Sequence, residues 1–379
     1  MSEWKEYILE DVIEKFIDYR GKTPKKTKTG IPLVTAKIVK SGRILEPNEF
    51  IAEDAYDSWM TRGLPEIDDV VLTTEAPLGE IALIKDKNVA LAQRIITLRG
   101  NKDFVHNPFL KYYFQSATGQ YELESRASGT TVFGIKAAVL KKVPVTLPPL
   151  HEQKAIASVL SSLDDKIDLL HRQNKTLEAM AETLFRQWFV EEAQEDWEEG
   201  CLGDVIELFD HLRIPLSKME RDKKKNGQLY PYYGAAKVMD YINDYIFDGD
   251  YILLGEDGTV RTDKGYPVLQ YATGKFWVNN HTHVIKAKPP YNNFFLWNYL
   301  SKKNIDEIIT GAVQPKINQG NLKTLDFPKL PEDLVEEFNE RTESFFKKIN
   351  QSQTQIHTLE KIRDTVLPKL MSSEVRVMI

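Results

Sequence analysis

Apolar residues recur at alternating spacings of four and three in two stretches of the chain, which predicts two long coiled-coil helices. The first stretch runs from Ile156 to Trp188 with one polar position, Asn174, and the second runs from Phe338 to Leu370 in matching register. The second seam is more polar, with Thr342, Ser352 and Arg363 among its positions. Prolines precede both stretches, and Pro368 is expected to end or bend the second helix.

A single apolar seam cannot bury itself, so we expect the two helices to pair with each other. Asn174 would then help to fix their register or orientation. The alternative is that each helix packs only on its own globular domain, but the seam is too long for a domain of that size to cover. The positions expected to make the pairing are Leu163, Ile167, Leu170, Asn174, Leu177, Phe345, Ile349, Ile356 and Leu359.

Short apolar runs separated by Gly, Pro, Asn and Asp precede each long helix, and they predict strands. The expected strands are Val70–Thr73, Ile81–Ile84, Ile95–Leu98, Tyr251–Leu254, Phe276–Val278 and His283–Ile285. Long regular helices do not alternate with these strands. The pattern therefore favours α+β domains over a doubly wound parallel sheet.

The chain is an internal duplication. "WKEYILEDVIE" at Trp4 returns as "WEEGCLGDVIE" at Trp197, and Asp69–Glu75 aligns with Asp250–Glu256. Further matches follow in the same order, and the offset between the copies falls from 193 residues at their start to 182 near their end. Two long copies are too few for a solenoid.

Composition indicates an ordinary globular protein of 379 residues with no membrane span and one cysteine, Cys201. The first residues lack the pattern of a signal peptide, which indicates a cytoplasmic protein. The net charge of −6 argues mildly against nucleic acid, but two lysine-rich stretches, at 20–43 and 213–225, follow the two copies of the opening phrase. Either they are solvated loops or they bind phosphate.

Catalytic motifs are missing from the sequence: neither a phosphate-binding P-loop nor a dinucleotide-binding glycine motif is found. His281 and His283 share one face of a predicted strand, but no third and fourth metal ligand is evident, so we expect no metal. Hydrogen-bonding side chains directed toward a surface or ligand are favoured there. "GEDG" at Gly255 is either a tight turn or an acidic site able to accept a hydrogen bond from a cytosine amino group.

Two similar modules joined by paired helices form a one-chain pseudodimer, an arrangement suited to reading two different DNA half-sites. With these features, the chain resembles the specificity subunit of type I restriction-modification systems over nearly its whole length. The resemblance is strongest in "SGTTVFGIKAAVLKKVPVTLPPLHEQKAIASVLSSLDDKI", "LFRQWFV", "VNNHTHVI" and "GAVQPKINQGNLKTLDFP". The second copy departs from it, with "LPEDLVEE" where the first has "PPLHEQ".

The resemblance implies target-recognition domains at 1–149 and 196–331, and antiparallel spacer helices at 150–195 and 332–379. It also implies a non-catalytic subunit that binds double-stranded DNA and docks two modification (methyltransferase) subunits, with restriction subunits in the full complex. No cofactor is expected in this chain, because S-adenosylmethionine and ATP with Mg²⁺ would be held by the partners.

Candidate DNA-binding residues follow from their type and place. Lysines and arginines in the basic stretches would bind phosphate, and polar side chains near predicted strand ends or in the loop before the closing strand would reach base edges or phosphate. The candidates are Lys25, Lys26, Lys28, Lys37, Arg43, Glu75, Gln93, Arg94, Thr130, Thr131, Lys136, Lys223, Lys224, Lys225, Glu256, His281, Gln314, Lys316 and Asn318.

Two other classes of function remain open. A coiled-coil adaptor that binds only proteins explains the helices but gives no reason for the two lysine-rich stretches. A self-sufficient enzyme, such as a methyltransferase–nuclease fusion, lacks its cofactor loop.

Overall fold

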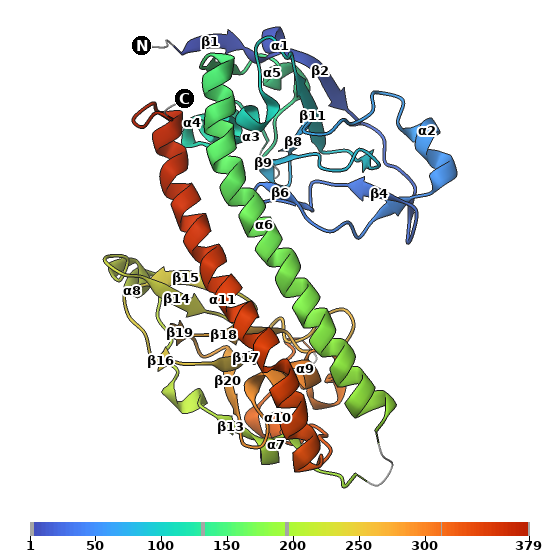
Figure 1. Ribbon diagram of the computed structural model, residues 1–379, viewed down its shortest axis with the longest axis vertical. Helices are drawn as coiled ribbons and strands as arrows, with labels where there is room; N and C mark the ends of the chain where they lie inside the picture. The colour runs from blue at the N-terminus through green and yellow to red at the C-terminus, as the bar shows by residue number, and fades with distance from the viewer. Residues whose placement is uncertain (1–3, 130–132, 194–196, 312, 378–379) are drawn as a thin grey trace. The chain divides into compact units, whose positions relative to one another are not determined.

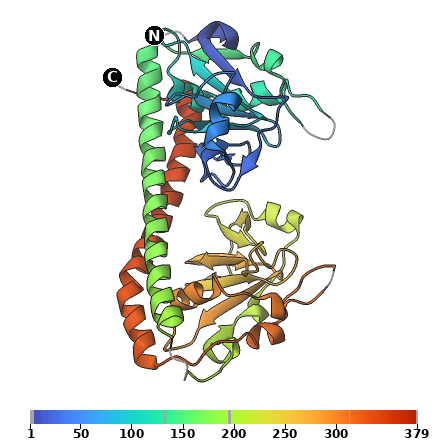
Figure 2. The same cartoon turned by 90° about the vertical axis from the view of Figure 1, so that its right-hand side faces the viewer.

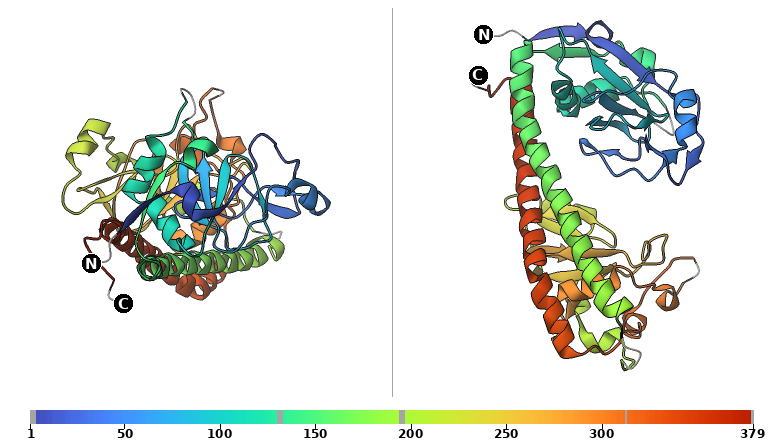
Figure 3. Two further views of the ribbon diagram at one scale, coloured as in Figure 1. Left: turned by 90° about the horizontal axis from the view of Figure 1, so that it is seen from above. Right: turned by 45° about the vertical axis from the view of Figure 1, so that its right-hand side comes forward.

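The computed structural model describes residues 4–129, 133–193, 197–311 and 313–377. The chain divides into two compact units, Met1–Leu169 with Ile356–Ile379 (unit 1) and Leu170–Gln355 (unit 2). The predicted long helices are present as α6 (Leu150–Arg186) and α11 (Glu332–Met371), and each contributes one part to each unit (Figure 1). Both chain ends belong to unit 1 (Figure 3).

Unit 1 is built on a four-stranded antiparallel sheet of order β2-β11-β8-β9. Its strands are β2 (Ile13–Asp18), β11 (Ile95–Gly100), β8 (Val70–Thr74) and β9 (Leu78–Leu83). A second sheet contains β10 (Ala90–Leu91), β4 (Ile31–Val34), β7 (Phe50–Ile51) and β3 (Lys26–Thr27). Two small pairs are β1 (Lys5–Ile8) with β12 (Pro144–Leu147) and β5 (Val39–Lys40) with β6 (Arg43–Ile44). The short helices are α1 (Leu9–Val12), α2 (Tyr56–Trp59), α3 (Asn107–Gln115), α4 (Ala117–Glu124) and α5 (Ala137–Leu140).

Unit 2 repeats this plan with a four-stranded antiparallel sheet of order β13-β20-β17-β18 (Figure 2). Its strands are β13 (Ile206–Leu208), β20 (Thr282–Ala287), β17 (Tyr251–Gly255) and β18 (Leu269–Ala272). The second sheet contains β15 (Val238–Ile242), β14 (Tyr230–Tyr233), β19 (Lys275–Val278) and β16 (Phe247–Asp248). The short helices are α7 (Leu202–Val205), α8 (Lys218–Lys223), α9 (Asn293–Leu300) and α10 (Gln319–Lys323). The six predicted strands are confirmed, with ends that differ by up to three residues, and so is the α+β class.

The repeated opening phrase has the same structural task in both units. It forms a single helical turn, α1 or α7, that leads into the edge strand of the main sheet. Each turn is fixed by its first backbone amide: Leu9 N donates to Val143 O at 2.9 Å, and Leu202 N donates to Leu325 O at 2.8 Å. The phrase is therefore retained because it starts each sheet.

Strand pairing corrects one detail of the sequence alignment, which placed Glu75 opposite Glu256. Thr74 N donates to Arg94 O, and Glu256 N donates to His281 O, both at 2.9 Å. Thr74 is thus the counterpart of Glu256, and Glu75 is the counterpart of Asp257. Sequence alignment alone cannot fix this register, because Glu75 can be aligned with either of two adjacent acidic residues, Glu256 or Asp257.

Within each unit, the parts of α6 and α11 pack side by side and run antiparallel. In unit 1, Leu160 of α6 and Leu370 of α11 share one apolar core, and Asp164 pairs with Arg363. In unit 2, Ala181 and Ile349 pack together. Pro368 lies in the last turn of α11, which ends at Met371.

The positions proposed for helix pairing differ in burial. Ile167, Leu170, Asn174, Ile349 and Ile356 are buried, while Leu163, Leu177, Phe345 and Leu359 are partly buried. Which of them contact one another across the helices stays a prediction.

Candidate nucleic-acid interface

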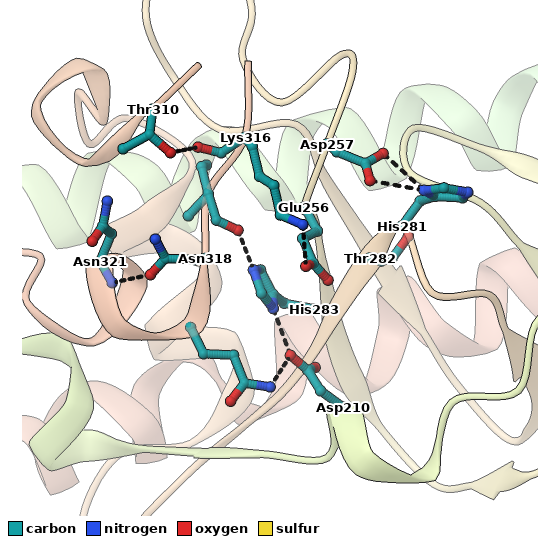
Figure 4. Close-up of polar contacts among 12 residues, drawn as sticks. Asp210, Glu256, Asp257, His281, Thr282, His283, Thr310, Lys316, Asn318 and Asn321 are labelled. Carbon is teal, nitrogen blue, oxygen red and sulfur yellow. Dashed lines mark hydrogen bonds and ion pairs between the residues drawn. The ribbon is translucent and has the colours of Figure 1, made fainter. Parts of the chain in front are cut away.

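The loop at 310–316 of unit 2 is tied to the end of the central strand β17 (Figure 4). Thr310 and Lys316 exchange backbone hydrogen bonds at 2.8 and 2.7 Å, and Ile317 N donates to Glu256 O at 2.8 Å. Gly311 has φ +86°, and a Cβ there would lie 2.3 Å from Gln314 O, so only glycine fits. The polar strand end and the loop are therefore held together by backbone hydrogen bonds.

A buried pair, Asp210 and His283, supports this loop from beneath. The Asp210 carboxylate lies 2.6 Å from His283 Nδ1 and accepts hydrogen bonds from Val284 N and Gln319 Nε2. Burial works to raise the pKa of Asp210, but the hydrogen bond and charge of His283, the Val284 amide and Arg213 hold it below its ordinary value.

His283 connects the Asp210 carboxylate to the loop. Its Nε2 lies 2.8 Å from Ile317 O, so both ring nitrogens face acceptors. The loop carbonyl of Ile317 is thus held by the ring of His283, whose other nitrogen contacts Asp210.

Glu256, the last residue before the exposed turn, lies between two cations. Its carboxylate accepts from Arg213 Nη1 at 2.7 Å and lies 3.4 Å from Lys316 Nζ. One ligand atom each from Asp210, Glu256 and His283 fall within 4.8 Å of one another, a spacing that would suit a metal ion. Arg213 and Lys316, both paired with Glu256, instead make the cluster an ion-pair network.

His281 and Asp257 form a second, more exposed pair at the same strand ends. His281 Nδ1 lies 2.8 and 2.9 Å from the two Asp257 oxygens, and the His281 side chain is 48% exposed. The two predicted strand histidines therefore have different tasks. His281 faces outward, and His283 supports the loop.

Unit 1 has the counterpart of this arrangement. Ser128 and Gly134 exchange backbone hydrogen bonds, and Ile135 N donates to Thr74 O at 2.9 Å. Here Arg20, braced by Asp18, donates to Ile135 O at 3.3 Å, where unit 2 uses His283. Arg94 Nε pairs with Glu75 Oε1 at 3.0 Å in an exposed position.

The structure therefore groups several of the predicted residues. Glu75 and Arg94 meet in unit 1, where Gln93 Oε1 lies 3.3 Å from Thr23 Oγ1, and Glu256 and Lys316 meet in unit 2. Asp210 and Asp257 are not among the predicted site residues. The sequence places Arg213 only in a basic stretch, and His283 only on a strand face expected to carry hydrogen-bonding side chains. Only the "GEDG" turn pointed toward Asp257, because the other partners are 34 to 109 residues from the groups they bind.

The remaining loop candidates have mixed surroundings. Asn318 Oδ1 accepts from Asn321 N at 2.8 Å and so caps α10, while Gln314 and Lys136 are exposed. Thr130 and Thr131 lie outside the described residues.

The basic candidates fall into two groups. Six already pair with carboxylates: Lys26 with Glu49, Arg43 with Asp168, Arg94 with Glu75, Lys224 with Asp244, Lys225 with Asp222 and Asp240, and Lys316 with Glu256. The two aspartates raise the pKa of Lys225. Among the described residues, no ion pair is found for the other group, Lys25, Lys28, Lys37, Lys136 and Lys223, all of them exposed. This second group retains its full charge for a phosphate.

Comparison with known proteins gives consistent matches. A family model, "Type I restriction modification DNA specificity domain", matches residues 1–179 and 194–363. The type I restriction enzyme MjaIX specificity subunit of Methanocaldococcus jannaschii is 26% identical over 370 residues, covering 86% of this chain and 82% of its own length. The putative MjaX specificity subunit of the same organism is 24% identical over 405 residues, covering 99% and 94%.

The fold matches a solved structure. The crystal structure of a type I restriction-modification system S subunit from M. genitalium has a TM-score of 0.56 at 18% identity, covering 97% of this chain and 96% of that one. In the part of the chain that is described, no helix is both long and apolar enough to span a membrane.

Proposed function

Because the chain belongs to the type I restriction-modification DNA specificity domain family, we propose that it reads a bipartite DNA target, with one half-site for each unit. Specificity subunits are the non-catalytic components of these systems, and this chain is accordingly not an enzyme. One observation carries the proposal: each unit builds, on a sheet of the same strand order, its own polar strand end with a loop tied to it.

The proposed domains are target-recognition domains at 1–149 and 196–331 and spacer helices at 150–195 and 332–379. The exposed faces of α6 and α11 would dock two methyltransferase subunits, and restriction subunits would join through them. S-adenosylmethionine, ATP and Mg²⁺ would be bound by those partners.

We assign the unpaired lysines to phosphate and the strand-end groups to bases. Lys25, Lys28, Lys37, Lys136 and Lys223 are exposed cations whose loss would weaken binding to every DNA sequence. The paired cations Lys26, Arg43, Lys224 and Lys225 would contribute less, because each would have to leave a carboxylate first. Glu75, Gln93, Arg94, Glu256, His281, Gln314, Lys316 and Asn318 would face base edges or their flanking phosphates.

The experiment is selection from a random duplex pool by the chain assembled with its partner methyltransferase, followed by mapping of methylated adenines. Two short enriched motifs separated by a fixed unread spacer are expected. A protein-only adaptor would enrich no sequence, and that result would refute the proposal.

A matched pair of lysine variants tests the assignment of phosphate contacts. Lys223→Ala should reduce the slope of log affinity against log salt by about 1 on any duplex. Lys225→Ala, which removes a cation already paired with Asp222 and Asp240, should change that slope less. Gln314→Ala should alter the preference within one half-site and leave the slope unchanged, and equal effects of all three variants would contradict the assignment.

A further inference from the structure

Strand register shows that the two units place a nitrogen-bearing side chain and a carboxylate at the same point of their main sheets. Arg94 and His281 are counterparts, because the carbonyl oxygen of each accepts a hydrogen bond from the backbone amide at the end of the adjacent strand, that of Thr74 in β8 or that of Glu256 directly after β17. The next residues, Glu75 and Asp257, are also counterparts. They make equivalent isolated bridges to the two loops, to Gly134 and Lys316.

Both pairs are intact although the residues differ. Arg94 Nε lies 3.0 Å from Glu75, and His281 Nδ1 lies 2.8 Å from Asp257. The two copies have thus diverged in residue type while keeping a donor beside an acceptor. An exposed ion pair adds only about 0–1 kcal/mol to stability, so stability is a weak reason for keeping it.

The exposure of the pairs leaves hydrogen-bonding capacity toward solvent. The side chains of Arg94 and Glu75 are 53% and 40% exposed, and those of His281 and Asp257 are 48% and 21% exposed. Arg94 retains further guanidinium donors, and His281 retains Nε2. Each carboxylate can accept more than one hydrogen bond.

Resting on the function proposed above, we propose that the pairs Arg94–Glu75 and His281–Asp257 are the equivalent base-reading positions of the two half-sites. A base pair in the major groove offers acceptors and donors side by side, and a nitrogen-bearing side chain paired with a carboxylate can present the complementary set. Arginine suits guanine O6 and N7, and a carboxylate suits the cytosine amino group, so Arg94–Glu75 fits a G·C pair. His281 and Asp257 have shorter side chains than Arg94 and Glu75, and His281 offers only Nε2 to a base. This pair would therefore select a different base pair.

Arg213 and His283, two largely buried nitrogen-bearing groups behind the pair in unit 2, position it rather than read DNA. Arg213 pairs with Glu256. Lys316 also pairs with Glu256, and His283 holds the loop that bridges to Asp257 (Figure 4). The groups that position the His281–Asp257 pair are therefore already engaged in ion pairs and hydrogen bonds with one another.

Exchanging the pairs tests the inference. Glu75→Asp with Arg94→His gives unit 1 the pair of unit 2, and Asp257→Glu with His281→Arg does the reverse. Each double variant, assembled with the methyltransferase, is selected on the random duplex pool. The expected result is a changed preference at one or two positions of one half-site, with the other half-site unchanged and the original site bound about 10- to 100-fold more weakly.

The controls separate the possible failures. Glu198→Ala with Lys329→Ala removes another exposed ion pair of unit 2, 3.0 Å long, and should leave the selected sequence unchanged. Thermal melting of each variant checks folding. If both exchanged variants select the wild-type sequence with wild-type affinity, or lose affinity equally for all duplexes, the base-reading inference is overturned. If the wild type itself enriches no sequence, the proposed function fails instead.

Discussion

Asp164 is a buried carboxylate through which α3 contacts the parts of α6 and α11 that belong to unit 1. Replacing it tests how strongly these helices are held together. It lies on α6 and accepts from Lys111 Nζ at 2.5 Å, Tyr112 Oη at 2.8 Å and Arg363 Nη1 at 3.1 Å. The Lys111 and Asp164 side chains are 5% and 12% exposed. Asp164→Asn would therefore leave a buried ammonium without its counter-ion.

The expected loss is about 3–5 kcal/mol, the range found when one partner of a buried ion pair is removed. Asp168 supplies a matched control one turn along the same helix. Its side chain is 39% exposed and pairs with Arg43 at 3.0 Å, so Asp168→Asn should cost about 0–1 kcal/mol. Urea unfolding followed by hydrogen–deuterium exchange measures the two units separately.

The dependence on pH has a definite sign. Burial works to raise the pKa of Asp164, but the charge and hydrogen bond of Lys111, with the bonds from Tyr112 and Arg363, hold it below its ordinary value. The contribution of this group is thus complete above the unfolded-state pKa, near 4, and is lost as the pH falls through the folded-state pKa. The difference between wild type and Asp164→Asn should shrink below about pH 4.

A third variant checks the cause. Replacing Lys111 and Arg363 by Met together with Asp164→Leu removes every charge of the network. Asp364, which also pairs with Arg363, keeps its charge but is 65% exposed and therefore solvated. This variant should regain most of the stability lost in Asp164→Asn, because the penalty comes from a buried unpaired charge. Equal stability of Asp164→Asn and Asp168→Asn, or no recovery in the apolar variant, would refute the reasoning.

Three further predictions concern other parts of the chain. Gln153→Ala should cost about 1–3 kcal/mol, because the Gln153 side chain bonds His106 N, Phe104 O and Pro148 O; thermal melting against exposed Lys154→Ala measures this. Gly119→Ala should cost about 1–3 kcal/mol or more, since its Cβ would lie 2.2 Å from Tyr113 O, and exposed Thr118→Ala is its control in the same denaturation assay. Asp210→Asn should destabilise unit 2 at neutral pH, and the difference from wild type should fade as acid protonates the wild-type carboxylate below about pH 4, as followed by circular dichroism from pH 3 to 7.

Local pattern determined much of the fold from the sequence alone. The heptad spacing predicted α6 and α11, the short apolar runs predicted strands of both main sheets, and the repeated phrases showed the duplication. These features are readable because a helix or strand places its apolar residues at a fixed period along the chain.

The candidate site was decided by tertiary structure. The lysine-rich stretch at 213–225 has only two acidic residues within it, yet β15 and the turn after it bring Asp240 and Asp244 to Lys225 and Lys224. Likewise, Asp257 meets His281 and Asp210 meets His283 only after the strands pair. Periodicity is a property of neighbouring residues, whereas which charges neutralise each other depends on strand order and register, which a single sequence does not display.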